Sequence, residues 1–418
     1  MSSSDEPDLP VWQREHIFPA KPEGSAYGVF TSKGRGLAFG NSDELIAHLQ
    51  QWKEPGSLIW TPDRERCFPP EEDIRFLDVL RKRKSSQAED DWSASRFRAF
   101  LFALPLIYSV WSAAAHGQLH RSQSLGLFGV IWLMLAGIPA YEAWKRKRRA
   151  AALNAESLGG EAQEVRFEIW LRRQHIPITK ALLGGLIGVY LVQVWSGMED
   201  GLGILSAIWY PKEVWGGAVQ TAGVAAAGLV KSHAGMGYFS GEWWRLFTAP
   251  TMHGLLIHIV MNGLGLLYLG RRAEVMAGWP HLLLVFLFAM ISGGVASAHG
   301  SPESSSVGAS GGIMGLLGFL LVFEYLHGRL VPKRATRRLL AAIGFTFVIG
   351  FVGYQNIDNW AHGGGLVAGM LYAGIVFPSS CSPHRPRATR MDVVFGLCSG
   401  LAVLAGAVYA VVRMRGFM

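Results

Sequence analysis

One serine and one histidine in the second half of the chain have the types and surroundings that acyl-transfer chemistry needs. Ser310 lies in the glycine-rich stretch VGASGGIMGLLGF, and His362 lies in the stretch NWAHGGGLVAGM. A serine hydroxyl becomes an effective nucleophile when a base takes its proton, and histidine is the usual base. Ser310 and His362 are therefore candidates for a catalytic dyad, with the serine as nucleophile and the histidine as base and then acid.

Acyl transfer also needs hydrogen-bond donors for the oxyanion that forms on the attacked carbonyl. His258 and Asn262 in the stretch HGLLIHIVMN are i and i+4 neighbours, so a helix places them on one face. The backbone N–H of Ser310 is a third candidate, because the first amides of a helix lack partners within it. A purely structural role for His258 and Asn262, in which they only join helices by hydrogen bonds, is the alternative.

Glycines follow both members of the candidate dyad at a spacing typical of close helix packing. Gly311 and Gly315 form one GxxxG pattern, and Gly365 and Gly369 form another just after the histidine. Small residues at this spacing let two helix backbones approach each other. The pattern predicts that the helix of the serine packs against the helix of the histidine.

The elements that carry these residues are predicted to be membrane helices. Of the 418 residues 50% are hydrophobic and only 17% are charged, whereas typical soluble domains have about 25% charged residues. A helix needs about 20 mostly apolar residues to cross a bilayer. Nine stretches are candidates, with an interfacial position as the alternative for the first two: 99–117, 124–143, 179–197, 252–269, 280–298, 309–327, 339–355, 360–377 and 393–412.

Lysine and arginine cluster after the second, fourth, sixth and eighth of these stretches. Because basic residues mark the cytoplasmic ends of membrane helices, the N-terminus is predicted to be cytoplasmic. The acidic first 20 residues resemble neither a secretory signal nor a transit peptide, which favours a bacterial inner membrane. We therefore expect the protein to interact with the lipid bilayer. We do not expect it to bind nucleic acid.

The first 95 residues are rich in charge and predict a small soluble α+β domain. We expect strands at Tyr27–Thr31 and Ser57–Thr61, helices at Asp43–Trp52 and Glu71–Lys84, and a polar linker at Ser85–Ser95. No motif in this domain indicates its role. Regulation, binding of an unknown partner and tethering all remain open.

Taken together, the motifs resemble those of rhomboid intramembrane serine proteases over about half of the chain. The matching residues are Trp244 and Arg245, His253, His258 and Asn262, Gly308 and Ser310, and Ala361 and His362 with Gly365 and Gly369. The resemblance implies a Ser310–His362 dyad that opens toward the extracytoplasmic side, with His258 and Asn262 at the oxyanion. It also implies that Arg245 belongs to a first loop that lies along the membrane. The sequence departs from the family at Met314, where members often have an aromatic residue that packs on the histidine.

The predicted fold is an all-α polytopic membrane protein whose six-helix rhomboid-like core is implied by the resemblance. Two extra spans precede the core, one extra span follows it, and the small soluble α+β domain comes first. The expected segments are a soluble domain with its linker at 1–95, two membrane helices with a basic end at 96–150, a linker at 151–178, the core at 179–377, and a linker with the last helix at 378–418.

The implied activity is hydrolysis of a peptide bond in or near the transmembrane segment of single-span membrane proteins, without a metal ion or other cofactor. Substrate access is expected past the fifth core helix at 339–355, where Phe345, Phe347 and Phe351 are candidates for an apolar gate. A catalytically silent relative that binds and routes membrane clients is the main alternative. A transporter is another, since polar residues in membrane helices also mark transport pathways.

Two other enzyme classes, and a catalytic role for Asp358, are the remaining alternatives. Residues 308–312 also fit the G-x-S-x-G elbow of α/β-hydrolases, but the preceding HGSPESSSV is no buried strand. The H-E-x-x-H motif of zinc proteases does not occur in the sequence. Asp358, four residues before His362, is either a third catalytic member or a helix-start residue, and we favour the second reading.

Overall fold

The computed structural model describes residues 8–31, 34–52, 56–117, 123–199, 201–209, 227–232, 236–354 and 356–416. The chain divides into two compact units. The first contains Met1–Arg173, Pro332–Ala335 and Gly344–Ile357, and the second contains Gln174–Val331, Thr336–Ile343 and Asp358–Met418.

The first unit begins with a three-stranded antiparallel sheet. Its central strand β1 (Tyr27–Phe30) pairs with β2 (Gly36–Phe39) on one side and with β3 (Leu58–Trp60) on the other. Helix α1 (Ser42–Gln51) follows β2, and the side chain of Asn41 caps it by accepting the N–H of Glu44. Both predicted strands and the predicted helix at Asp43–Trp52 are confirmed, whereas the sequence does not predict β2. The helix predicted at Glu71–Lys84 begins later, at Leu77. Short 3₁₀ helices lie at Val11–Gln13, Glu15–Ile17, Pro70–Glu72 and Ile74–Phe76.

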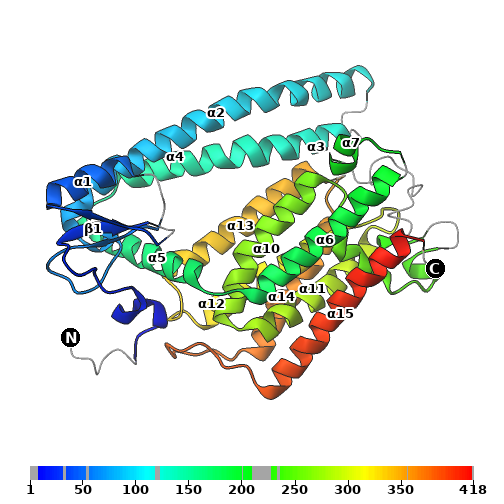
Figure 1. Cartoon of the computed structure of the whole chain (residues 1–418). Coiled ribbons are helices and arrows are strands. Elements are labelled where there is room, and N and C mark those ends of the chain that lie inside the picture. Colours follow the sequence, from blue (N-terminus) through cyan, green and yellow to red (C-terminus); the bar gives the residue numbers. More distant parts are fainter. Residues whose placement is uncertain are drawn as a thin grey trace. The chain divides into compact units, whose positions relative to one another are not determined.

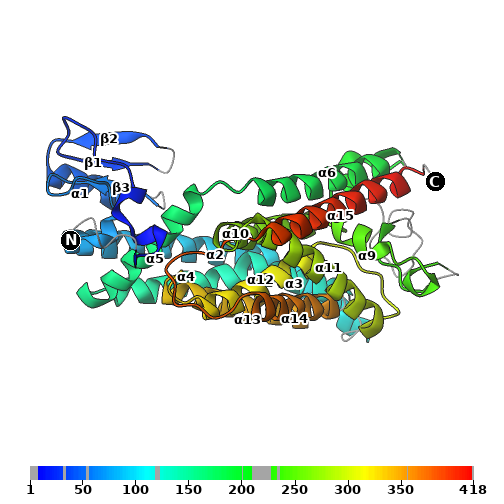
Figure 2. The same ribbon diagram turned by 90° about the horizontal axis from the view of Figure 1, so that it is seen from below.

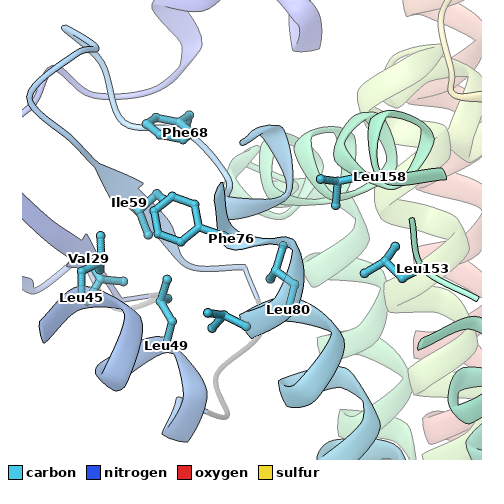
Figure 3. Close-up of a cluster of buried hydrophobic side chains, with 10 residues drawn as sticks. Val29, Leu45, Leu49, Ile59, Phe68, Phe76, Leu80, Leu153 and Leu158 are labelled. Carbon is cyan, nitrogen blue, oxygen red and sulfur yellow. The ribbon is translucent and has the colours of Figure 1, made fainter. Parts of the chain in front are cut away.

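A hydrophobic core joins this sheet to the neighbouring helices, as Figure 3 shows. Leu45 and Leu49 lie four residues apart on α1 and therefore face the core together, toward Val29 and Ile59 of the sheet. The other buried members of the cluster are Phe68, Phe76, Val79, Leu80, Leu153 and Leu158. The N-terminal region is thus folded around apolar side chains of its own.

The predicted polar linker at Ser85–Ser95 is wrong, because helix α2 runs from Leu77 to Ala115. Its charged residues pair with α4 (Ile138–Ala151): Arg146 lies 2.6 Å from Asp91, and Lys147 lies 2.5 Å from Glu89. Helix α3 (Gln123–Trp132) continues through a π-helical turn (Leu133–Gly137) into α4. These three elements run beside α2 (Figure 1). Charged residues within Ser85–Ser95, which suggest a linker in the sequence, thus form ion pairs between α2 and α4.

The stretch predicted as a linker at 151–178 contains helix α5 (Ala155–Arg173). Its residues Leu158, Phe167 and Ile169 are buried. Arg166 donates hydrogen bonds to Glu72 at 2.8 Å and to the carbonyl of Trp12 at 2.9 Å. Helix α5 is therefore a folded part of the first unit, and not a free connection.

The second unit is a helical bundle. Its elements are α6 (Pro177–Glu199), α7 (Ile204–Trp209), α9 (Arg245–Thr248), α10 (Leu256–Met276), α11 (Trp279–Gly300), α12 (Ser310–Leu326), α14 (Asn359–Val376) and α15 (Arg390–Met414), with 3₁₀ helices at Tyr238–Ser240 and Ala249–Thr251. Helix α13 (Lys333–Val352) contributes residues to both units. Figures 1 and 2 show α6 and α15 side by side, where Arg415 pairs with Glu199 at 2.5 Å.

The described part of the chain contains six helices that are long and apolar enough to cross a membrane. They are Ile74–Ala115, Ser124–Ala151, Pro177–Glu199, Trp279–Gly300, Arg334–Val352 and Arg390–Met414. Arg245–Thr251 and Leu256–Met276 add a seventh if the bent pair, with an angle of 96°, counts as one span. The other two of the nine predicted spans are the helices α12 and α14, whose crossing stays a prediction. The fold is nevertheless the predicted polytopic helical membrane protein with a small α+β region at its N-terminus.

Candidate active site

The two predicted oxyanion residues lie in the first turns of α10. Because the helix begins at Leu256, His258 and Asn262 are one turn apart on the same face, and Asn262 is buried. His253 precedes the helix and is buried, with its ring edge-on to that of His258 at a centroid distance of 5.1 Å. These three side chains form one polar cluster at the start of α10.

Gln193 of α6 is a contributor that the sequence analysis misses. Its side chain donates to the carbonyl of His253 at 3.1 Å and accepts the N–H of the same residue at 3.0 Å. This two-way hydrogen bond fixes the backbone just before α10. An isolated amide within a predicted membrane span is the signal that could have identified it.

Gly308 connects this cluster to the segment that carries the serine. Its φ of +116° lies in a region that residues with a side chain rarely adopt. A Cβ atom on Gly308 would lie 2.5 Å from Cε1 of His258 and 3.4 Å from Nδ2 of Asn262. The backbone two residues before Ser310 therefore lies directly against the predicted oxyanion donors.

Ser310 is the first residue of α12, and no side chain caps this helix. The first N–H groups of a helix have no partner within it and form its positive end. The N–H of Gly308 just before the helix is bound by the carbonyl of Ala249 at 3.0 Å. The start of α12 thus has the geometry expected of an oxyanion donor, and that role stays a prediction.

Helices α12 and α14 meet through their glycines. A Cβ on Gly365 would lie 2.1 Å from the carbonyl oxygen of Gly311, and one on Gly369 would lie 1.9 Å from that of Gly315. Such distances leave no room for a methyl group. The predicted close packing is confirmed, and it brings the ends of α12 and α14 that bear the candidate dyad together. The hydrogen bond between Ser310 and His362 stays a prediction.

Several buried polar atoms around these residues have no hydrogen-bond partner in the structure. They are Nδ1 of His362, Nδ2 of Asn262, and both ring nitrogens of His253. Buried polar atoms are rarely left unpaired in proteins, so each needs an explanation. Of these atoms, Nδ2 of Asn262 lies 3.4 Å from the position that a Cβ on Gly308 would take.

Asp358 serves as a helix-start residue. It caps α14 by accepting the N–H of Ala361 at 2.9 Å, and its other oxygen accepts the hydroxyl of Ser297. Since both oxygens are engaged, the structure favours this reading over a role as a third catalytic member.

Trp244 and Arg245 stabilise the first loop, which connects α6 to α10. Arg245 is buried, donates to Glu242 at 2.8 Å and to the carbonyl of Gly228 at 2.7 Å, and lies over the ring of Trp244. Burial alone would raise the pKa of Glu242, but the hydrogen bonds from Arg245 and from the N–H of Gly237 lower it overall. Met314 is buried in α12, one turn after the serine.

A cavity of about 30 Å³ lies beside the candidate dyad. Gly308, Gly311, Ala361 and Leu246 are among its lining residues, so it borders the neighbours of both Ser310 and His362. A cavity of this size is large enough for one water molecule.

The rhomboid domain family matches residues 240–379 of the chain, which include every predicted site residue. Rhomboid protease GluP of Bacillus subtilis (strain 168) is 35% identical over 161 residues, which cover 38% of this chain and 31% of GluP. Putative rhomboid protease YdcA of the same strain is 30% identical over 137 residues, which cover 32% of this chain and 68% of YdcA. Inactive rhomboid protein 1 of Papio anubis is 29% identical over 172 residues, which cover 39% of this chain and 20% of that protein. The chain thus spans only about a third of the length of GluP.

Proposed function

Because the chain belongs to the rhomboid family, we propose that it is an intramembrane serine endopeptidase. The family contains proteases as well as inactive members, so the proposal depends on the residues of this chain. Its main support is the glycine contact between α12 and α14, which brings together the helix ends that carry Ser310 and His362. The fit of Gly308 against His258 adds a second support from an independent helix.

In the proposed reaction, the Ser310 hydroxyl attacks the carbonyl carbon of a peptide bond while His362 takes its proton. His362 then gives this proton to the departing amine, which leaves an acyl group on the serine. A water molecule, deprotonated by His362, releases the acyl group and restores the serine. His258, Asn262 and the N–H of Ser310 donate hydrogen bonds to the oxyanion in both steps.

Rhomboid proteins act on membrane-protein substrates within the bilayer, and we propose single-span proteins as the substrates of this chain. A helical substrate must unwind locally before it reacts, because helix hydrogen bonds shield its peptide groups. We propose access past α13. Its Phe347 and Phe351 are 80% and 78% exposed, whereas Phe345 lies against Tyr141 with ring centroids 5.8 Å apart. This sparse packing supports movement of α13.

The chain is a multi-pass membrane protein, and we propose that it lies in a bacterial inner membrane with its N-terminus in the cytoplasm. The support is the position of the basic clusters, such as Lys145–Arg149 at the end of α4. This orientation places Ser310 near the extracytoplasmic surface.

The test is cleavage of a tagged single-span reporter by the full chain in liposomes, with wild type, Ser310→Ala and His362→Ala side by side. We expect cleavage by the wild type alone, and labelling of Ser310 by a fluorophosphonate in the wild type but not in Ser310→Ala. Equal cleavage by all three proteins would refute the dyad.

A catalytically silent client-binding protein is the second candidate function, favoured by the similarity to an inactive rhomboid protein. It predicts that the wild type binds the reporter, does not cleave it, and is not labelled by the fluorophosphonate. Binding is measured by co-purification of the intact reporter with the wild type and with Ser310→Ala.

A further inference from the structure

A fully buried lysine lies in the first loop, at a position to which no motif or similarity assigns a role. Lys231 is 1% exposed and belongs to the described segment 227–232. Burial lowers the pKa of Lys231, and the negative charge of Asp358 only partly offsets this effect. An ammonium group is expensive to bury unless it is well paired, so its partners indicate its purpose.

The partners of Lys231 are at the end of α11 and in the turn that follows. Its Nζ donates to the carbonyl of Ser301 at 2.7 Å and to the hydroxyl of Ser304 at 3.2 Å. The Ser304 hydroxyl in turn donates to the carbonyl of Ser301 at 3.2 Å. Ser301 is the C-cap of α11, and a positive charge is favourable at this negative end of a helix.

The backbone beside Lys231 holds the same loop a second time. Leu229 and Ser306 exchange two backbone hydrogen bonds, of 2.9 and 3.1 Å. The N–H of Gly308 then binds the carbonyl of Ala249. The segment from Ser301 to Gly308, which leads directly to Ser310, is therefore attached to the first loop at three points.

The first loop can hold the turn in place, because the backbone around Lys231 is itself fixed by further hydrogen bonds within the loop. The carbonyls of Val230 and Lys231 accept the N–H groups of Tyr238 and Phe239 at 2.8 and 3.0 Å. The buried Arg245 binds the carbonyl of Gly228 in the same segment. A displacement of the turn at Ser301 would thus require the loss of the lysine contacts.

We propose that Lys231 is a positioning residue for the nucleophile. Its ammonium group fixes the turn at Ser301–Ser304, and this turn sets the location of Gly308 and Ser310 relative to His258 and His362. The catalytic part of this inference rests on the proposed function, whereas the structural part does not. A displacement of about 1 Å in a catalytic group can lower a rate by about 100-fold.

The experiment compares the wild-type full chain with Lys231→Met, which removes the charge, and with Glu303→Gln as the matched control. Glu303 is exposed in the same turn. The measurements are hydrogen exchange of peptides covering residues 301–309, the rate at which a fluorophosphonate labels Ser310, and kcat and KM for the reporter. In Lys231→Met we expect faster exchange, labelling and kcat lower by about 10- to 100-fold, and little change in KM. Glu303→Gln is expected to match the wild type.

A folded Lys231→Met protein with wild-type exchange and labelling would overturn the inference. If Lys231→Met does not fold, Ser304→Ala decides the question, because it keeps the charge and removes one of its two partners. We expect about threefold slower labelling in Ser304→Ala, and the wild-type rate would overturn the inference.

The two proposals fail in different ways. If the wild type is not labelled but Lys231→Met still exchanges faster at 301–309, the protease function is wrong and the positioning of the loop by Lys231 stands. If the wild type is labelled and cleaves, and Lys231→Met behaves identically in every measurement, the inference alone is wrong.

Discussion

At the scale of single residues, the candidate site depends most on Gly308. Replacement by Ala would place a methyl group 2.5 Å from the His258 ring at a φ of +116°. We expect Gly308→Ala to lower the labelling rate of Ser310 by about 100-fold, because the clash displaces the backbone before the nucleophile. Fluorophosphonate labelling of purified protein measures this effect.

Gly241→Ala is the matched control for this prediction. Gly241 also has a positive φ, of +93°, but a Cβ there meets no atom within 4 Å. Gly241→Ala should destabilise the protein by about 1–2 kcal/mol through backbone strain. It should leave the labelling rate of Ser310 near that of the wild type. If both variants lose labelling equally, backbone strain explains the effect, and the clash with His258 does not.

The buried thiol of Cys67 gives a second prediction at this scale. Burial raises the pKa of Cys67 to about 11, and the charge of Arg173 only partly opposes this shift. Because the thiolate is the reactive form, Cys67 should react with maleimide slowly at neutral pH and faster as the pH approaches its pKa. Peptide mass spectrometry compares it with the exposed Cys381, which should react first. Faster alkylation of Cys67 than of Cys381 at neutral pH contradicts the prediction.

Single residues also show what the sequence can and cannot predict. His258 and Asn262 are predictable because a spacing of four residues places them on one helix face, whereas Gly308 is implied by the family resemblance. The structure brings these three residues together. Gln193 and Lys231 acquire their roles from partners 60 and 70 positions away in the chain. Spacing within one segment carries no information about such partners.

At the scale of elements, the contact of α12 with α14 can be tested with two glycines of the same helix. Gly369→Ala directs a methyl group at the backbone of Gly315, whereas a Cβ on Gly374 meets no atom within 4 Å. We expect Gly369→Ala to destabilise the protein by about 1–3 kcal/mol and to slow labelling of Ser310. Gly374→Ala should have the thermal stability of the wild type. Thermal unfolding in detergent makes the comparison, and equal stability of the two variants would contradict the assigned packing.

The errors of the sequence analysis at this scale have one physical cause. Polar residues at Ser85–Ser95 and in 151–178 suggest linkers, but they lie on α2 and α5. The pairs Asp91–Arg146 and Glu72–Arg166 join residues that are far apart in the chain. Charges matched across helices look the same in a sequence as charges that face water.

Two buried glutamates within the bundle also make contacts that the sequence does not reveal. Arg272 of α10 pairs with Glu324 of α12, and both side chains are buried. Glu274 accepts the N–H groups of Ile178 and Thr179 at the start of α6, at 3.1 and 2.8 Å. The sequence alone does not distinguish these two paired carboxylates from carboxylates at helix ends that face water.

At the scale of the whole molecule, α13 is the helix that belongs to both compact units. Its last residue, Val352, meets α3 within the first unit, where a Cβ on Gly129 would be 2.9 Å from Cγ1 of Val352. Its first turn lies near α5, with Arg334 at 3.6 Å from Glu164. The two ends of the helix that we propose to move for substrate entry therefore contact α3 and α5.

A disulfide between Gly129→Cys and Val352→Cys, in a chain without its three native cysteines, tests this arrangement. If substrates pass α13, the oxidised protein should cleave the single-span reporter several-fold more slowly than the reduced protein. Labelling of Ser310 by a small fluorophosphonate should not change, because the reagent needs no movement of α13. Unchanged reporter cleavage after complete oxidation argues against access past this helix.

The glycine contact between α12 and α14 also bears on how the protein is made. Helix α14 falls outside the set of described helices that are apolar enough to span a membrane by themselves, and α12 precedes it in synthesis. The glycine-rich start of α14 becomes favourable in the membrane when a partner covers its backbone. We therefore expect insertion of α14 to depend on its docking against α12. If the proposed dyad is right, we expect a nascent chain to carry Ser310 before His362 is docked beside it, and to become active only after α14 has packed on α12.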